Sequence, residues 1–367
     1  MSFSGLRVLL VGPLPPPAGG MANQTRQLAE LLRGEGASVE LVRTNAPYRP
    51  AWAAQLKGLR ALFRLLPYLA QLWRGAGRAD VVHVMANSGW SWHLFAAPAV
   101  WIASLRGVPV VVNYRGGEAG SFLARAAPAV RASMRRAAML AVPSGFLQQV
   151  FVGYGMPARI VPNIIDLGRF HPANPPRQAG RAPHLLVARN LEAIYGNDTA
   201  LRAFVLLSEH YPAATLTLAG AGPEADALAA LARELGVAER VRFPGRLDRD
   251  EMAALYRDAD LMLNASRVDN MPNAILEALA SGLPVVTTDA GGIPFMVEHR
   301  RTAMLAPVDD APALAAAMRD VLDDASLRTA LVSQGLTEVQ RYRWSSVRAE
   351  LLAAYQAALQ TQQVRPT

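Results

Sequence analysis

Two acidic residues in the second half of the chain stand eight positions apart, where their carboxylates could accept hydrogen bonds from the hydroxyl groups of a bound sugar or nucleotide. They are Asp269 and Glu277, within the segment Ser266–Gly292, SRVDNMPNAILEALASGLPVVTTDAGG. Between and after them, Pro272 suits the first position of a helix and Gly282 suits its left-handed end. The segment therefore predicts a short helix with one carboxylate just before it and the other inside it.

The amino end of this helix is a ready phosphate site. A buried strand at Leu261–Asn264 leads toward it and places Asp269 and the backbone amides of Asn273 and Ala274 around the helix N-terminus. Such an end carries partial positive charge and free N–H donors, which favour anions. Glu277 falls about two turns along the helix, with its carboxylate free to accept hydroxyl hydrogen bonds. The alternative interpretation is an ordinary solvated helix with an acidic first turn.

The same segment resembles the signature of family-4 glycosyltransferases, in which two acidic residues eight apart are followed by alanine, a small residue and Gly-x-Pro-Val-Val. The matching residues of this chain are Asp269, Glu277, Ala278, Gly282, Pro284, Val285 and Val286. The resemblance implies an α/β chain of the GT-B type, with two doubly wound Rossmann-like domains facing a central cleft. It also implies that Asp269 handles the donor sugar and that Glu277 binds the ribose hydroxyls. The first acid is commonly glutamate, so Asp269 shortens the reach by one methylene and leaves the identity of the sugar open.

The donor-phosphate segment of the family resembles Val187–Phe204 of this chain. The family pairs an arginine there with a downstream lysine before a glycine, and Arg189 matches the arginine. Tyr195 stands in place of the lysine, and the only lysine of the whole chain is Lys57. One fixed cation is therefore missing unless another arginine, such as Arg267, compensates. We interpret the change as a subfamily variant, with an inactive site as the alternative.

The segment Gly12–Met21, GPLPPPAGGM, resembles the family's N-terminal glycine loop after the first strand. The resemblance implies that Gly19 and Gly20 let the backbone approach the donor phosphates. The loop is not a GxGxxG dinucleotide fingerprint, which argues against a dehydrogenase. The other residues predicted to bind the donor are Asn190, Arg246, Asn270, Met271, Asn273 and Ala274.

The acceptor side carries fewer motifs. Val111–Glu118, VVNYRGGE, occupies the place where many relatives carry a catalytic-site histidine. The matching position here is Arg115, which could hold an acceptor phosphate in a bidentate manner, although a surface arginine in a βα loop is an equal alternative. Glu118 is the only carboxylate near that turn. His83 ends a buried strand, and we interpret it as a satisfied core histidine rather than a catalytic base.

No side chain stands out as a covalent nucleophile. This fits the retaining route that the resemblance implies, in which the leaving phosphate helps to deprotonate the acceptor. The triplet Asp258-Ala259-Asp260 imitates a metal-binding DxD, but it lies where a helix ends and a strand begins. Enzymes of this fold generally need no metal. We therefore predict no metal and no cofactor, with the nucleotide-sugar as a substrate.

Apolar runs bounded by glycine and proline alternate with helical patterns, which predicts βαβ units and parallel sheets whose ligands bind at the carboxyl ends of the strands. The predicted strands are Leu6–Val11, Val39–Val42, Val81–Val84, Val108–Asn113 and Met139–Val142, then His184–Ala188, Thr215–Ala219, Val241–Phe243, Leu261–Asn264 and Pro284–Thr288. The proline-rich stretch 171–183 is the predicted linker between an acceptor-binding domain, 1–170, and a donor-binding domain, 184–343. Trp344–Tyr355 resembles the family's last helix, so we predict that the end of the chain, 344–367, is a helix that crosses back to the first domain.

The charge of the chain is unevenly divided. Residues 1–170 contain 18 Lys and Arg against 6 Asp and Glu, although the whole chain has a net charge of only +8. A basic lobe of this kind should attract an anionic partner. The stretch Ala51–Arg78 places apolar and aromatic residues at helical spacing with basic residues between them. It therefore predicts either a helix lying on an anionic membrane surface or a core-facing helix with a basic edge.

No apolar run reaches the roughly 20 residues that a membrane-spanning helix needs, and the first residues read as a buried strand rather than a signal peptide. The chain has no cysteine, which suits a reducing compartment. We therefore expect a cytoplasmic protein with peripheral contact at the inner face of the plasma membrane.

The leading hypothesis is a retaining transferase that moves a sugar from a UDP- or GDP-sugar to a lipid-linked or other anionic saccharide in polysaccharide or glycoconjugate synthesis. A nucleotide-sugar epimerase would need acidic and histidine groups converging on the sugar, and the sequence does not provide that set. The missing lysine suggests a rival from another class, a non-catalytic nucleotide-sugar-binding scaffold of a polysaccharide-assembly complex. Nucleic-acid binding is disfavoured because no recognised binding module is present.

Overall fold

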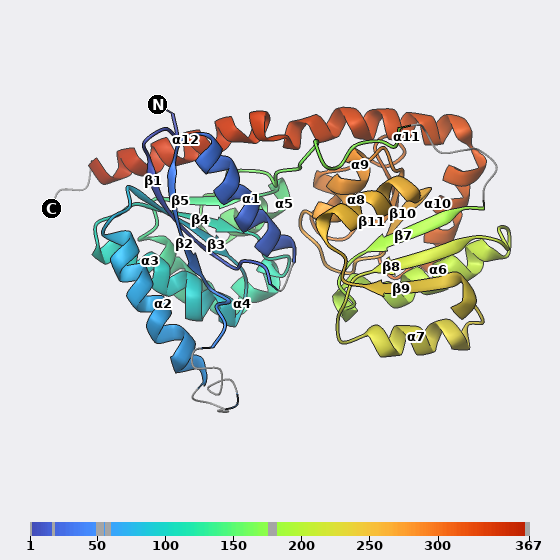
Figure 1. Ribbon diagram of the computed structural model, residues 1–367, viewed down its shortest axis with the longest axis horizontal. Helices are drawn as coiled ribbons and strands as arrows, with labels where there is room; N and C mark the ends of the chain where they lie inside the picture. The colour runs from blue at the N-terminus through green and yellow to red at the C-terminus, as the bar shows by residue number, and fades with distance from the viewer. Residues whose placement is uncertain (1, 17–18, 49–54, 56–59, 175–181, 364–367) are drawn as a thin grey trace. The chain divides into compact units, whose positions relative to one another are not determined.

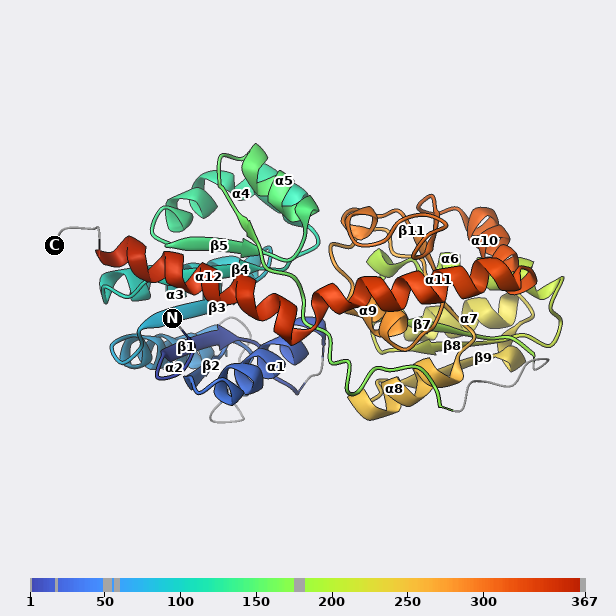
Figure 2. The same cartoon turned by 90° about the horizontal axis from the view of Figure 1, so that it is seen from above.

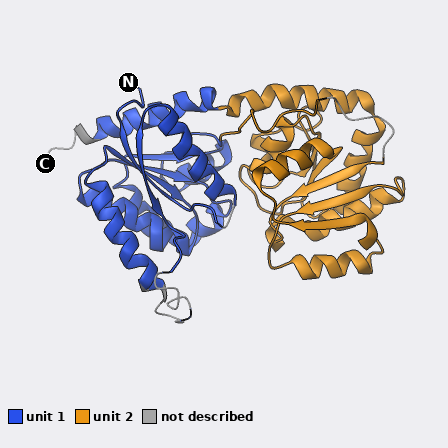
Figure 3. Ribbon diagram, in the orientation of Figure 1, with its two compact units in different colours: residues 1–163, 344–367 blue, residues 164–343 orange. Residues whose placement is uncertain are grey.

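The computed structural model describes residues 2–16, 19–48, 55, 60–174 and 182–363. The chain divides into two compact units, of which unit 1 is 1–163 with 344–367 and unit 2 is 164–343 (Figure 3). Each unit is built around one six-stranded sheet with helices packed on it (Figure 1). All the strand pairs of both sheets are parallel, as the alternating strand and helix patterns predict.

The sheet of unit 1 has the order β2-β1-β3-β4-β5-β6. Its strands are β1 (Arg7–Gly12), β2 (Ser38–Arg43), β3 (Val81–Ala86), β4 (Val110–Tyr114), β5 (Met139–Val142) and β6 (Arg159–Ile160). The strand order reverses between β1 and β3, which makes the carboxyl ends of these strands a topological switch point.

One face of this sheet packs on helices that follow one another along the chain. They are α2 (Arg60–Ala76), α3 (Ala97–Leu105) with the π-helical turn η2 (Trp92–Ala96), α4 (Ala119–Met134) and α5 (Gly145–Gly153), while α1 (Gly20–Gly34) contacts β1 and β2. Side chains alternate between the two faces of a strand. In β3, Val82 and Val84 therefore join the apolar core with α2 to α5, while His83 between them faces the C-terminal helix.

That last helix, α12 (Trp344–Gln363), lies across β3, β4 and β5 of unit 1 (Figure 2). Its Tyr355 packs edge-on against Phe3 with a centroid separation of 5.8 Å, and Trp344 stacks on the same Phe3 at 6.0 Å. Glu35 accepts a hydrogen bond from the Trp344 indole at 3.0 Å and forms an ion pair with Arg348 at 2.7 Å. Helix α12 therefore contributes buried side chains to unit 1.

The sheet of unit 2 has the order β12-β11-β10-β7-β8-β9. Its strands are β7 (His184–Ala188), β8 (Thr215–Ala219), β9 (Val241–Gly245), β10 (Leu261–Asn264), β11 (Val285–Thr288) and β12 (Met304–Ala306). Its helices are α6 (Asn197–Ser208), α7 (Ala225–Glu234), α8 (Arg249–Asp258), α9 (Asn273–Ala280), α10 (Ala311–Asp323) and α11 (Ala325–Glu338). Here the order reverses between β7 and β10.

Each of the ten predicted strands corresponds to a strand of the structure, with ends that differ by up to two residues. Two further strands, β6 and β12, were not predicted because they contain only two and three residues, too few for an alternating pattern. His83 lies in the middle of β3 and not at its end, since that strand continues to Ala86.

The division between the units precedes residue 164, whereas the sequence placed the linker at 171–183. The difference arises because Ile165 and Phe170 are buried in a core cluster of unit 2. Part of the predicted linker, 175–181, lies outside the described residues.

The predicted basic helix at Ala51–Arg78 corresponds to α2, whose described part begins at residue 60; Trp52, Leu56, Lys57 and Leu59 lie outside the described residues. Its apolar side chains divide between two environments. Tyr68 and Leu72 are buried in the core, while Leu66 and Trp73 are 63% and 48% exposed. No helix in the described part of the chain is long and apolar enough to cross a membrane.

Candidate functional site

The switch point of the unit 2 sheet brings together residues that are far apart in sequence. Arg189 directly follows β7, and Ser266 and Asp269 follow β10, the neighbouring strand on the other side of the reversal. Ligands of doubly wound sheets bind in the crevice at such a point. Two of the residues predicted to be catalytic, Arg189 and Asp269, therefore meet where the fold favours a ligand.

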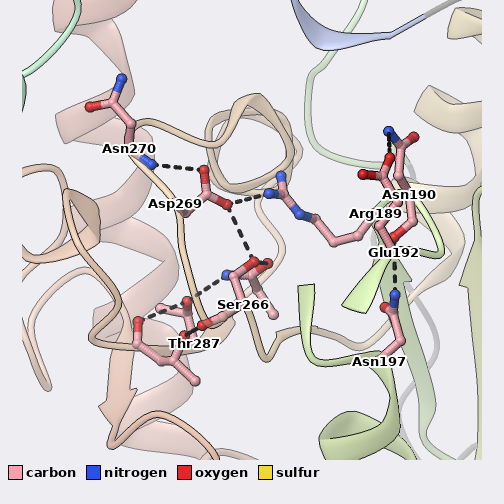
Figure 4. A network of polar contacts seen from close by, with 10 residues as sticks. Arg189, Asn190, Glu192, Asn197, Ser266, Asp269, Asn270 and Thr287 are labelled. Atoms are coloured by element: carbon pink, nitrogen blue, oxygen red, sulfur yellow. Dashed lines mark hydrogen bonds and ion pairs between the residues drawn. The ribbon is translucent and has the colours of Figure 1, made fainter. Parts of the chain in front are cut away.

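Figure 4 shows that Arg189 and Asp269 form an ion pair, with the Arg189 Nη2 donating to Asp269 Oδ2. The two side chains are only 11% and 12% exposed, so water screens the pair less than it would at the surface. Asp269 also accepts hydrogen bonds from the Ser266 hydroxyl at 3.3 Å and from the backbone amide of Asn270 at 2.9 Å. The carboxylate is thus fixed by three donors.

A buried polar frame beneath the ion pair holds Ser266 in position. The Ser266 hydroxyl has a single proton, which it shares between Asp269 and Asn264 Oδ1 at 3.0 Å, and Asn264 donates to the Thr287 hydroxyl at 2.9 Å. The Thr288 hydroxyl donates to the backbone oxygen of Ser266 at 2.6 Å. All four side chains are completely buried. Because a buried polar group without a partner is costly, this frame has few alternative arrangements.

The guanidinium of Arg189 packs on the ring of Tyr195, the residue that stands in place of the family's lysine. Its guanidinium carbon lies 4.1 Å from the centroid of the Tyr195 ring, which is a cation–π contact. Tyr195 ends a short 3₁₀ turn, and Gly196 after it adopts a left-handed conformation with φ of 58°. A side chain at Gly196 would also collide with the backbone oxygen of Ala265, at 2.1 Å. The Nε of Arg189 is buried and has no hydrogen-bond partner among the described residues.

Arg267 does not compensate for the missing lysine, contrary to the suggestion from the sequence. Its guanidinium donates to Asp309 at 2.7 Å, to Asp198 at 2.8 Å and to the backbone oxygen of Ala193 at 2.6 Å. These contacts tie β10 to the start of α6 and use each of its nitrogens. Arg267 is therefore structural.

The four residues predicted around the start of α9 follow Asp269 closely along the chain. Asn270, Met271 and Ala274 are buried, and Asn273 is the first residue of the helix. Gly292 fixes the backbone in front of them. Its amide donates to the Asp269 carbonyl at 3.0 Å, and a side chain at Gly292 would lie 2.0 Å from the carbonyl oxygen of Asn270.

Glu277 lies inside α9, as predicted, but its carboxylate is not wholly free. The hydroxyl of Tyr256, on α8, donates to Glu277 Oε2 at 3.0 Å. Burial raises the pKa of Glu277 to about 7, an effect that the Tyr256 hydrogen bond and the charges of Arg249 and Arg189 only partly oppose. The sequence did not predict the role of Tyr256, because no local pattern indicates that a tyrosine on the preceding helix contacts Glu277.

Two further donor-binding predictions fall on exposed positions. Asn190 follows Arg189, and its side chain donates to Glu192 at 3.0 Å. Arg246 follows β9 and is exposed. Asp258 and Asp260 lie at the amino end of β7, where they accept hydrogen bonds from the ring and the backbone amide of His184 at 2.9 and 2.7 Å. Within the described residues, no group of three acidic, histidine or cysteine side chains is arranged to hold a metal ion.

The remaining predicted residues belong to unit 1. Gly20 begins α1 at the carboxyl end of β1, and Gly19 caps that helix with open space around its α-carbon. Arg115 follows β4 at the same edge of the sheet, and its Nη1 donates to Gln24 of α1 at 3.5 Å and to the side-chain oxygen of Asn163. Its Nε donates to Asn113 at 3.2 Å. Burial lowers the pKa of Arg115 to about 10, and amide oxygens, not carboxylates, are its side-chain partners among the described residues.

A chain of buried hydrogen bonds connects Arg115 to the C-terminal helix. Arginine can only donate, so Asn113 Oδ1 accepts from Arg115 and the Asn113 amide nitrogen donates to His83 Nε2 at 3.2 Å. The His83 ring proton must then be on Nδ1, which donates to the Tyr355 hydroxyl at 3.0 Å. Burial and the nearby Arg115 lower the pKa of His83 to about 3. His83 is therefore neutral and fully engaged, which is a structural role.

Comparison with known protein families gives two matches that together span most of the chain. The family model described as Glycosyltransferase Family 4 matches residues 18–169, and the model described as Glycosyl transferases group 1 matches residues 182–324. The second range contains the whole sheet of unit 2, and the first contains every strand of the unit 1 sheet except β1.

Individual relatives agree with the family models. The chain is 32% identical over 296 residues to a glycogen synthase of Mycobacterium tuberculosis, covering 77% of this chain and 69% of the relative. It is 26% identical to a GDP-mannose-dependent alpha-(1-6)-phosphatidylinositol monomannoside mannosyltransferase of the same species, covering 94% and 97%. Among solved structures, HepE of Anabaena in complex with UDP and glucose superposes with a TM-score of 0.71 at 17% identity, covering 95% and 98% of the two chains.

The raised pKa of Glu277 predicts a pH-dependent effect of removing its charge. Between its ordinary value of 4.5 and about 7, the folded chain keeps the proton that the unfolded chain loses. Stability therefore falls as pH rises through this window, and the loss is complete above about pH 7. We expect Glu277→Gln to remove this loss. The difference in free energy of unfolding, variant minus wild type, should therefore be about 2 kcal/mol larger at pH 8 than at pH 5.

Urea unfolding of both proteins at the two pH values measures this difference. Glu234→Gln, at an exposed position of α7, is the matched control for removing one carboxylate. An equal effect of Glu277→Gln at pH 5 and pH 8 would contradict the prediction.

Proposed function

Because the chain belongs to family 4 of the glycosyltransferases and has the GT-B fold, we propose that it is a retaining glycosyltransferase that uses a UDP- or GDP-sugar. The acceptor is a lipid-linked or other anionic saccharide. The observation that carries this proposal is the Arg189–Asp269 ion pair at the switch point of unit 2. In this pair, a cation that can bind a phosphate, Arg189, lies beside a carboxylate that can accept hydrogen bonds from sugar hydroxyls, Asp269.

On the donor side, each group has a separate task. Arg189 and the backbone amides at the start of α9 bind the diphosphate, since a helix N-terminus favours anions. Glu277 accepts hydrogen bonds from the ribose hydroxyls, and Asp269 accepts them from the sugar. The roles of the two acids follow the family resemblance, and the geometry of the ion pair supports them because Asp269 and Arg189 lie side by side (Figure 4).

Transfer begins when the bond between the sugar and the diphosphate breaks. Negative charge then develops on the departing phosphate, and a preorganised donor such as Arg189 contributes roughly 3–4 kcal/mol to its stabilisation. The acceptor hydroxyl oxygen then bonds to the anomeric carbon on the face that the leaving group occupied, which retains the configuration, and its proton passes to the departing phosphate oxygen. We propose that no metal or other cofactor takes part.

Unit 1 is the acceptor-binding unit in this proposal. Arg115 binds an anionic group of the acceptor, because its side-chain partners are neutral amide oxygens that leave its charge uncompensated. A membrane-borne acceptor is supported by the exposed side chains of α2 and α3. Trp73 and Leu105 are 48% and 71% exposed, and Arg106 lies over the Trp73 ring at 4.9 Å. Aromatic and cationic groups of this kind suit an anionic membrane surface at the cytoplasmic side.

The alternative is a nucleotide-sugar-binding scaffold without turnover, which the absent lysine favours. The contact between Arg189 and Tyr195 argues against it, because an aromatic ring that orients the remaining cation is a replacement rather than a simple loss.

A panel of UDP- and GDP-sugars distinguishes the enzyme from the scaffold. We expect release of nucleoside diphosphate from one donor, stimulated by membrane lipid extract, resistant to EDTA and abolished in Glu277→Ala. Binding of the nucleotide without release under every condition would instead establish the scaffold.

The roles of the ion-pair residues predict opposite effects on nucleotide affinity. Arg189→Gln should weaken binding of UDP or GDP by about 10- to 100-fold, because a charge-assisted hydrogen bond is lost. Asp269→Asn should leave that affinity unchanged or increase it, since the guanidinium is released, while sugar transfer falls by about 100-fold or more. Calorimetric titration and turnover assays measure the two quantities. Equal weakening of nucleotide binding by both substitutions would mean that Asp269 only positions Arg189.

Arg115→Gln tests the acceptor side. We expect the transfer rate to an anionic acceptor to fall by about 10- to 100-fold, while binding of the nucleoside diphosphate is unchanged. Arg125→Gln, at an exposed position of α4, removes the same charge and serves as the control. If Arg115→Gln reduces transfer no more than this control, the acceptor's anionic group binds elsewhere.

A further inference from the structure

Unit 1 contains a cavity of about 530 Å³ that lies away from the residues assigned to the reaction. It is bounded by the C-terminal end of α4, the first residues of β5 and the segment that joins α5 to β6 (Figure 2). The amino end of β5 is at this place, whereas Arg115 follows the carboxyl end of the neighbouring strand β4. Because the two strands are parallel, the cavity and Arg115 lie at opposite edges of the sheet.

The wall of the cavity is mainly apolar. Met134, Leu140 and Met156 line it, and the last two are buried within the apolar core of unit 1. Methionine side chains adapt to the shape of an apolar ligand, and the volume is in the range of small-molecule sites. A flexible hydrocarbon chain suits such a wall.

Three arginines supply positive charge to the same cavity, and no lining residue in the described part of the chain is acidic. Arg131 donates to the backbone oxygen of Tyr154 at 2.8 Å, while its Nε is buried without a hydrogen-bond partner among the described residues. Arg159 is paired with Glu350 at 3.0 Å, but both side chains are more than a third exposed, so this pair is weak. Arg135, the third, is exposed.

From this combination we propose that the cavity is a second binding site, for an anionic amphiphile with one apolar chain and a phosphate or carboxylate head. The chain occupies the space between Met134 and Met156, and the head lies among the three arginines. The proposal is independent of glycosyl transfer, because the amino edge of a parallel sheet is not where its substrates bind.

Decyl phosphate, used below its micelle concentration, is the probe for the full-length protein. Calorimetric titration should show saturable binding at one site, and inorganic phosphate and decyl maltoside should bind at least about tenfold more weakly, since each lacks one of the two features. No saturable binding, or equal binding of decyl maltoside, would overturn the proposal.

Two substitutions address the site itself. Arg135→Gln removes a cation from the cavity, and Ala158→Leu reduces its volume; each should weaken decyl phosphate binding by about tenfold. The matched control is Arg136→Gln. Arg136 is the exposed neighbour that lies over the Trp101 ring at 3.8 Å and does not line the cavity. An equal effect of the control substitution would mean general electrostatic attraction and would overturn the site. Thermal unfolding of each variant verifies that it is folded.

Vesicles containing phosphatidylglycerol identify the source of the amphiphile. If Ala158→Leu weakens binding to the vesicles as well as to decyl phosphate, the natural ligand is a bilayer lipid. If it weakens only decyl phosphate binding, the ligand is a dissolved amphiphile. If it weakens neither, no ligand occupies the cavity and the proposal fails.

Discussion

The ion pair between Arg189 and Asp269 joins the two halves of the unit 2 sheet where its strand order reverses. Taking two charges partly out of water costs more than their attraction returns unless other hydrogen bonds complete the arrangement. Ser266 and the amide of Asn270 supply those bonds to Asp269, and a frame of fully buried polar side chains fixes Ser266. Opening the pair without replacement would leave both charges unmatched. The pair therefore presents a guanidinium and a carboxylate side by side, each held in place by its partners.

In unit 1, the buried cation Arg115 is held by neutral groups instead of a carboxylate. Arg115 is held by amide oxygens. Hydrogen bonds lead from it through Asn113 and His83 to Tyr355, and their directions are fixed because a guanidinium can only donate. The last bond comes from α12, so the C-terminal helix of the chain takes part in orienting a residue of the candidate acceptor site. Neutral partners fix the position of the guanidinium but do not neutralise it, which leaves its charge available to an anion.

The sequence predicted the elements whose apolar residues recur at regular spacing, and it predicted the site residues that lie within one short segment. Alternating apolar runs located ten strands, and the spacing of Asp269 and Glu277 placed one acid before α9 and the other within it. The sequence did not predict contacts between segments that are distant along the chain. Neither the Tyr256 hydroxyl on Glu277 nor the Tyr355 hydroxyl on His83 follows from any local pattern. The same holds for the ion pairs of Arg267, whose acidic partners come from α6 and the β12–α10 loop. Local spacing identifies which groups are present, while tertiary packing decides which of them remain free.

The two departures from the family pattern change the distribution of charge in a consistent way. Tyr195 removes a cation from the donor unit but stacks on the one that remains, so Arg189 loses freedom of movement while the total charge falls. Arg115 adds a cation to the acceptor unit at the place where relatives carry a histidine, and burial does not remove its proton at neutral pH because its pKa stays near 10. A histidine there could exchange a proton with the acceptor, whereas an arginine cannot. Arg115 can therefore offer a permanent charge to an anion, but it cannot accept a proton at neutral pH.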